Sequence, residues 1–167
     1  MPRGARMRKV ALFVPLFLLA LYSPAAETPA TRKAVARRVF EEIFNQGKFE
    51  VADQIYAKDF VNHGVTRDIG LKEDQAAARG WRSAFPDLRT QVDKVLVDGE
   101  FVTVLWSGEG TNTGEGNGLP ATGKKLKGRG ITIWRISGGR IREEWSEFDQ
   151  LRILQQLGLM PIPPDTE

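Results

Sequence analysis

The stretch from Arg140 to Gly158, RIREEWSEFDQLRILQQLG, decides the fold of this chain. It begins as a strand pattern that carries Trp145 and several carboxylates. It then runs directly into a short helical pattern, Gln150–Leu157, which Gly158 closes. Such an arrangement can place acid/base groups on the wall of an apolar cavity. It restricts the fold more tightly than it restricts the chemistry.

The residues that lead into this stretch alternate between apolar and polar side chains with a period of two, as strands do. Asp98-Gly99 and Ser137-Gly138-Gly139 mark the turns of two hairpins. Residues 108–128 hold seven glycines and one proline without an apolar run, so we expect a long flexible connection there. The predicted strands are residues 91–97, 101–107, 131–136 and 140–148.

The first half of the domain shows helical periodicity instead. Thr28 and Pro29 are typical of an N-cap and a first-turn proline. The predicted helices run from Thr28 to about Gly47, over residues 50–56 and over residues 72–84. Helices followed by consecutive antiparallel strands predict an α+β fold rather than a parallel sheet.

Residues 1–25 have the pattern of a signal peptide. Four basic residues precede an apolar stretch, residues 10–22, which is short for a membrane-spanning helix. Ser23-Pro24-Ala25 supplies the small residues of a cleavage site. We therefore expect an exported protein, periplasmic or secreted, in which residues 26–167 form a single domain with its core at about 31–160. The alternative is an uncleaved membrane anchor.

Composition excludes several classes of function. The formal charge of +3 includes the four basic residues of the signal segment, so the mature chain is close to −1, which argues against a nucleic-acid partner. The chain has no Cys and one His, so we expect no metal and no cofactor. The segment Gly118–Lys124 starts like a phosphate-binding loop, but Lys125 stands where Ser or Thr is needed. After signal cleavage we expect no membrane association.

A series of short motifs runs through the chain in a characteristic order and spacing. They are Phe60-Val61-Asn62-His63, Ala84-Phe85-Pro86-Asp87-Leu88, Gly110-Thr111-Asn112-Thr113-Gly114, Pro120-Ala121-Thr122-Gly123-Lys124, Gly139-Arg140-Ile141, Glu144-Trp145 and Gln156-Leu157-Gly158. Together they resemble the SnoaL-like polyketide cyclases, also called ester cyclases, over roughly residues 35–161. The resemblance implies the nuclear-transport-factor-2-like fold, in which a curved antiparallel sheet wraps around N-terminal helices to form a cone with an apolar pocket.

The resemblance also implies a chemistry and an assembly. Cyclases of this family close a ring by an intramolecular aldol reaction without metal or cofactor, using an acidic residue near the final strand. They commonly form homo-oligomers through the sheet. Asn112 and Thr132 stand where family members often carry His. The catalytic Asp of the family aligns near Ser146, and a small shift of the alignment brings either Glu147 or Asp149 to that site.

The candidate catalytic residues are His63, Glu147 and Asp149, and each has a structural alternative. The imidazole of His63 suits proton transfer at neutral pH, or it is a turn histidine bonded to the backbone. Glu147 becomes a desolvated base if Trp145, on the same strand face, points into the cavity; otherwise it is an exposed partner of an arginine. Asp149 precedes the last helix and is also a natural N-cap.

The remaining candidates would bind a small hydrophobic molecule. Asn62 and Thr132 are polar groups that could steady an enolate, and the aromatic residues would form the pocket wall or simply the core. Three functions follow: an acid/base enzyme that cyclises, isomerises or hydrates a carbonyl compound, a non-catalytic binding module, and an interaction protein that uses the outer sheet face. The aromatic candidates are Trp81, Phe85, Trp106 and Trp145.

Overall fold

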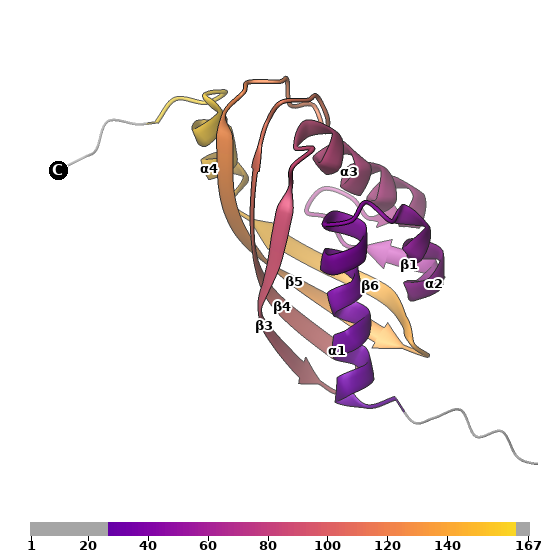
Figure 1. The fold of residues 1–167 in the computed structure, drawn as a ribbon. Coiled ribbons are helices and arrows are strands. Elements are labelled where there is room, and N and C mark those ends of the chain that lie inside the picture. The colour runs from indigo at the N-terminus through magenta and orange to yellow at the C-terminus, as the bar shows by residue number, and fades with distance from the viewer. Residues whose placement is uncertain (1–26, 163–167) are drawn as a thin grey trace, which may run out of the picture.

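A curved six-stranded sheet carries the fold of residues 27–162, the part of the chain that the computed structural model describes. The strand order is β2-β1-β6-β5-β4-β3. Figure 1 shows the long strands β3 to β6 bending around the helices. This confirms the predicted α+β fold; the predicted signal segment lies outside the described residues. The strands are β1 Tyr56–Asn62, β2 Ile69–Gly70, β3 Arg89–Asp98, β4 Phe101–Thr111, β5 Lys125–Ser137 and β6 Arg140–Phe148.

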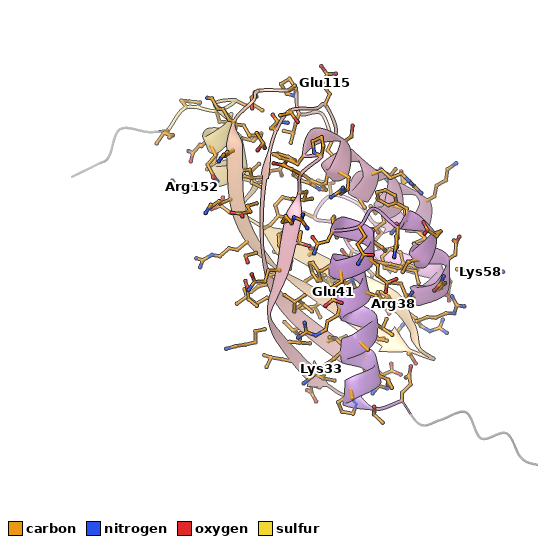
Figure 2. All side chains as sticks on the ribbon, in the orientation of Figure 1. Lys33, Arg38, Glu41, Lys58, Glu115 and Arg152 are labelled. Atoms are coloured by element: carbon orange, nitrogen blue, oxygen red, sulfur yellow. The ribbon has the colours of Figure 1, made fainter. Side chains whose placement is uncertain are left out.

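The helices begin and end largely where the sequence predicts. Thr28 caps the first helix in a capping box with Thr31, whose backbone N–H donates to Thr28 Oγ1 at 3.2 Å. The predicted helix up to Gly47 is α-helical at first and π-helical at its end, and its charged residues Lys33 and Glu41 lie on the exposed side (Figure 2). The helical segments are α1 Pro29–Arg38, η1 Val39–Phe44, η2 Phe49–Val51, α2 Ala52–Ile55, α3 Leu71–Ala84 and α4 Gln150–Leu157.

Strand β1 departs from the predicted order of helices followed by antiparallel strands. It lies between α2 and α3 and pairs in parallel with β6, with Asn62 opposite Glu144. The predicted second helix therefore ends before Tyr56, which already belongs to the strand. The parallel pairing has a functional consequence, because it places the end of β1 beside the middle of the last strand.

The connection between β4 and β5 is shorter and more ordered than predicted. The two strands pair along their whole length, from Phe101 opposite Arg135 to Thr111 opposite Lys125, so a connection over residues 108–128 is wrong in extent. The fully buried Asn112 ties the remaining loop together. Its Nδ2 donates to the carbonyl oxygens of Ala84 and Gly114 at 3.1 and 3.0 Å. Its Oδ1 accepts from the Thr122 backbone N–H and hydroxyl at 3.0 and 2.8 Å.

Two apolar clusters fill the space between the helices and the inner face of the sheet. The larger one joins α1 and η1 to the sheet through residues such as Phe40, Ile43 and Trp134. The smaller one lies under α4, around Phe85 and Leu157. None of the helices in residues 27–162 is both long and apolar enough to span a membrane.

We predict that Asn112→Ala lowers the free energy of unfolding by about 2–4 kcal/mol, because it leaves buried backbone groups without partners. The matched control is Thr113→Ala at an exposed position of the same loop, where we expect a change within about 0.5 kcal/mol. Urea denaturation measures both changes. A loss below about 1 kcal/mol for Asn112→Ala would contradict the structural role of this side chain.

Candidate active site

A cavity of about 950 Å³ lies between the helices and the inner face of the sheet. Aromatic side chains from six elements (η1, β1, α3, β4, β5 and β6) form much of its wall, and this size suits a small organic ligand. Seven of the nine sequence candidates border the cavity, whereas Phe85 and Trp145 do not. Those that border it are Asn62, His63, Trp81, Trp106, Thr132, Glu147 and Asp149.

The alternation of side chains along β6 decides which carboxylate enters the cavity. Glu144 is buried, and Ser146 bonds Thr132 on the neighbouring strand, at the cavity wall. Consecutive strand residues point to opposite faces, so the side chains of Trp145 and Glu147 point to the outer face, and Glu147 borders the cavity only as an exposed residue of the strand. The expectation that Trp145 faces the cavity is therefore wrong, and the desolvation expected for the exposed Glu147 is found at Glu144 instead.

Glu144 shares the base of the cavity with a second carboxyl group, Asp74, from the first turn of α3. The amide Nδ2 of Asn62 donates to Asp74 Oδ1 at 2.9 Å and to Glu144 Oε1 at 3.4 Å. The indole Nε1 of the buried Trp134 donates to Glu144 Oε2 at 2.7 Å. Gln75 Nε2 donates to Asp74 Oδ2 at 3.2 Å. Neutral donors thus hold both carboxyl groups, and in the described part of the chain no cationic side chain pairs with them.

Burial changes the protonation of this pair. Desolvation, reinforced by the nearby Asp74 charge, raises the pKa of Glu144 to about 8, although the Trp134 hydrogen bond opposes the shift. Burial also raises the pKa of Asp74, while the hydrogen bonds from Asn62 and Gln75 lower it. At neutral pH, Glu144 therefore carries a proton inside an apolar cavity. The same two carboxyl groups, after burial itself, hold the pKa of Tyr56 well above its ordinary value.

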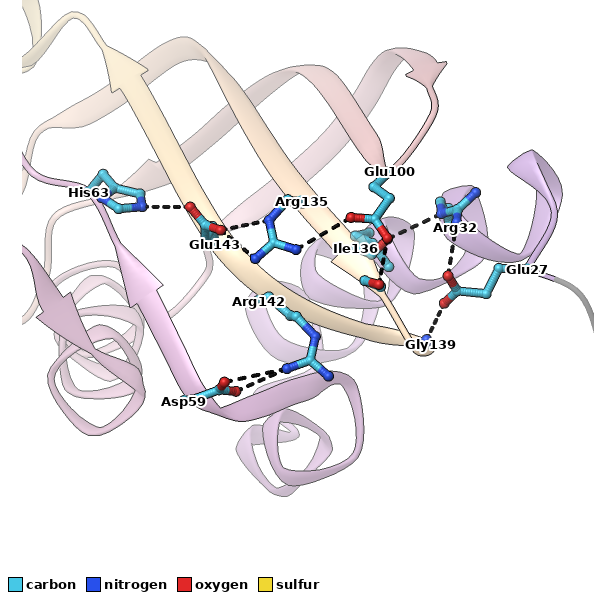
Figure 3. A network of polar contacts seen from close by, with 11 residues as sticks. Glu27, Arg32, Asp59, His63, Glu100, Arg135, Ile136, Gly139, Arg142 and Glu143 are labelled. Carbon is cyan, nitrogen blue, oxygen red and sulfur yellow. Dashed lines mark hydrogen bonds and ion pairs between the residues drawn. The ribbon is translucent and has the colours of Figure 1, made fainter. Parts of the chain in front are cut away.

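The imidazole of His63 is engaged on the outer side of the sheet. Its Nε2 lies 3.0 Å from Glu143 Oε2 and its Nδ1 lies 3.3 Å from Asp68 Oδ2. The ring stacks on Trp145 with a centroid distance of 4.6 Å. Figure 3 shows that Glu143 continues the network to Arg135. Both ring nitrogens thus have carboxylate partners, and His63 anchors the loop between β1 and β2 at the cavity rim.

The other sequence candidates have distinct positions. Asp149 Oδ1 accepts a hydrogen bond from the backbone N–H of Arg152 at 2.9 Å, which confirms the N-cap alternative. Phe85 is fully buried in the cluster under α4, behind Trp81, rather than in the cavity wall. Asn62 and Thr132 line the cavity as expected; their roles toward a ligand remain predictions.

Two carboxyl residues of the site were not among the sequence candidates, Glu144 and Asp74. An acidic residue in the first turn of a helix, such as Asp74, is common because it interacts favourably with the helix dipole, so its position carries no catalytic signal. The alternation along β6 did place Glu144 and Glu147 on opposite faces of the sheet. Only the direction of Trp145 could tell which of these faces borders the cavity. Within residues 27–162, no group of three or more His, Cys, Asp and Glu side chains is placed to hold a metal ion.

Comparisons with known proteins agree with this architecture. The family profile of the SnoaL-like polyketide cyclases matches residues 34–157. A comparison with curated proteins found no match.

Solved structures include AclR, a candidate hydroxylase from Streptomyces galilaeus, with 22% identity, TM-score 0.74 and coverage of 83% of this chain and 87% of AclR. TsrD from Streptomyces laurentii has 24% identity, TM-score 0.73 and coverage of 81% and 100%. A candidate polyketide cyclase from Bacillus cereus has 28% identity, TM-score 0.67 and coverage of 78% and 82%.

We predict that Glu144 makes the folded state less stable as the pH rises. The folded protein retains the Glu144 proton up to a pKa of about 8, whereas the unfolded chain releases it near the ordinary value of 4.5. The stabilisation is complete below the lower value and is lost as the pH rises through the higher one, at up to about 1.4 kcal/mol per pH unit.

Denaturation at pH 5, 6, 7 and 8 tests this expectation. Glu144→Gln should flatten the decline in unfolding free energy, while Glu147→Gln, at an exposed position, should leave it unchanged. An identical slope in wild type and Glu144→Gln would show that the carboxyl group is not protonated in the folded state.

Proposed function

The chain belongs to the SnoaL-like polyketide cyclase family, and from this premise we propose that it is an acid/base enzyme that acts on a small hydrophobic carbonyl compound without a cofactor. The observation that carries the proposal is the buried carboxyl group of Glu144 beside Asp74 at the base of an apolar cavity, where desolvation raises the pKa of Glu144 to about 8. A carboxylic acid that stays neutral at pH 7 can donate a hydrogen bond to a carbonyl oxygen, which an ordinary carboxylate cannot do.

In the proposed reaction the two carboxyl groups exchange roles. Asp74 takes a proton from the carbon next to the substrate carbonyl while Glu144 gives its proton to the carbonyl oxygen, so that an enol forms. The negative charge passes from Asp74 to Glu144, and the net charge of the buried pair does not change. The existing bonds from Trp134 and Asn62 then hold the new carboxylate of Glu144. This balance favours proton transfer, because no unpaired charge is added to the cavity.

The enol can then react in more than one way. Attack of its carbon on a second carbonyl group of the same molecule closes a ring, and return of a proton to a different carbon isomerises the compound. The aromatic wall, which includes Trp81, Trp106 and Phe148, suits a flat hydrophobic substrate for either outcome.

We propose in addition that the protein is exported and assembles through the sheet. The export proposal rests on the pattern of residues 1–25 alone. The assembly proposal rests on the family resemblance and on three large apolar side chains exposed on the sheet, since exposed apolar patches commonly mark interfaces. These side chains are Leu96, Phe101 and Ile131.

N-terminal sequencing of the protein from the native cell envelope or medium tests export. We expect the mature chain to begin at or near Ala26, because residues 23–25 supply the small side chains of a cleavage site. An intact Met1 in a cytoplasmic fraction would contradict the proposal.

The catalytic proposal predicts that the wild-type protein accelerates deuterium exchange next to the carbonyl group of 2-tetralone, followed by NMR in D₂O. Glu144→Gln and Asp74→Asn should each lower this rate by about 10²–10⁴-fold, the usual contribution of a positioned acid or base, while 2-tetralone still binds.

Glu147→Gln and Asp149→Asn are the matched controls, and both should stay close to the wild-type rate. Loss of exchange in either control, with activity retained in Glu144→Gln, would mean that the wrong carboxyl group has been chosen. Binding of 2-tetralone without any exchange in the wild type would favour the non-catalytic binding module.

A further inference from the structure

Three polar side chains form a chain of hydrogen bonds on the cavity wall, apart from the two carboxyl groups. The indole Nε1 of Trp106 donates to Thr132 Oγ1 at 3.1 Å. The hydroxyl oxygens of Thr132 and Ser146 lie 2.8 Å apart, on residues directly opposite each other in β5 and β6. All three residues line the cavity.

Burial favours one direction for this chain of hydrogen bonds. An indole N–H can only donate, so Thr132 Oγ1 accepts from Trp106. Thr132 is buried, and among residues 27–162 its hydroxyl group has Ser146 as its one acceptor. An unsatisfied buried O–H is unfavourable, which favours donation from Thr132 to Ser146 over the reverse. The hydroxyl proton of Ser146 then has no acceptor among the described residues of the chain, and Ser146 is half-buried at the cavity wall.

Gly130 explains how Trp106 reaches Thr132. The two residues Trp106 and Gly130 lie opposite each other in β4 and β5. A Cβ atom at Gly130 would collide with the indole ring and would lie 2.7 Å from the carbonyl oxygen of Glu147. Because Gly130 has no side chain, the indole ring of Trp106 can lie across β5. Its Nε1–H then reaches the hydroxyl group of Thr132, two residues further along the strand. The backbone therefore holds the hydrogen-bond chain in place before any ligand arrives.

We propose that Ser146 is a second hydrogen-bond donor to the substrate, positioned by Thr132 and Trp106, and that the substrate therefore carries two acceptor oxygens on one edge. This inference rests on the proposed function, since Glu144 supplies the first donor. Glu144 and Ser146 are two residues apart on the same face of β6, which separates their Cα atoms by roughly 7 Å. That spacing selects a compound whose two oxygens lie well apart, rather than the chelating pair of a single β-dicarbonyl unit.

Three simple ketones test the spacing: acetophenone, 1,3-diacetylbenzene and 1,4-diacetylbenzene. The 1,3-isomer can turn both oxygens toward one wall, whereas the 1,4-isomer has the same composition but points its second oxygen away. With dissociation constants measured by ligand-observed NMR, we expect the wild type to bind the 1,3-isomer about 3–10-fold more tightly than the 1,4-isomer, the effect of one additional hydrogen bond.

The variants identify the donor. Ser146→Ala should abolish the preference for the 1,3-isomer, and Ser146→Thr should retain it because the hydroxyl group is kept. Thr132→Val keeps the Ser146 hydroxyl but removes the group that orients it, so the preference should fall. Ser137→Ala on β5, whose hydroxyl bonds Glu100 away from the cavity, is the matched control and should keep the wild-type preference.

The outcomes separate this inference from the proposed function. The inference is overturned if the ketones bind without any isomer preference, or if folded Ser146→Ala or Thr132→Val keeps the full preference. Ser146 is then only a cross-strand partner of Thr132, and the proposed function is not affected. If none of the three ketones binds the wild type, the proposed carbonyl site fails and the inference fails with it.

Discussion

The site depends on one constraint: the buried carboxyl group of Glu144 lies beside the half-buried one of Asp74, and no cationic side chain among residues 27–162 pairs with either. Such a pair is tolerated only if it holds a proton and if donors satisfy the remaining oxygens. Trp134 and Asn62 supply those donors to Glu144, and Asn62 also reaches Asp74. Asn62 can do so because β1 runs parallel to β6 and places it opposite Glu144. The parallel pairing of β1 with β6 therefore provides one of the hydrogen-bond donors on which the chemistry of the cavity depends.

An open cavity and a protonated buried carboxyl group both lower the free energy of unfolding, so contacts elsewhere in the domain must compensate. The connection above the cavity is held by the four hydrogen bonds of the buried Asn112. The outer face of the sheet carries a separate network, in which His63 and Arg135 both bond the carboxylate of Glu143. The proposed acid/base residue Glu144 thus lies on the inner face of β6, and structural ion pairs lie on its outer face.

Local rules of the sequence predicted much of this fold. The N-caps Thr28 and Asp149 and the glycine turns at residues 99 and 138–139 depend on neighbouring residues only, and the structure has them. Strand β1 was missed because its sequence, YAKDFVN, lacks a clean alternation and its partner lies about 80 positions away in the chain. The extent of β4 and β5 was missed because glycines within paired strands look like loop residues.

The candidate site was harder to predict than the fold, because its chemistry depends on which face of β6 is buried. The pattern separates Glu144 from Glu147 by face but does not say which face is inner. Asp74 becomes a partner of Glu144 only through the packing of α3 against β1, and no local sequence pattern identifies it.

A titration of the Glu144 carboxyl group, followed by ¹³C NMR of side-chain-labelled Glu and assigned by comparison with Glu144→Gln, tests the central claim most directly. The account predicts a neutral carboxylic acid at pH 7 that ionises with a pKa of about 8. A Glu144 signal that is already fully ionised at pH 6 would contradict it.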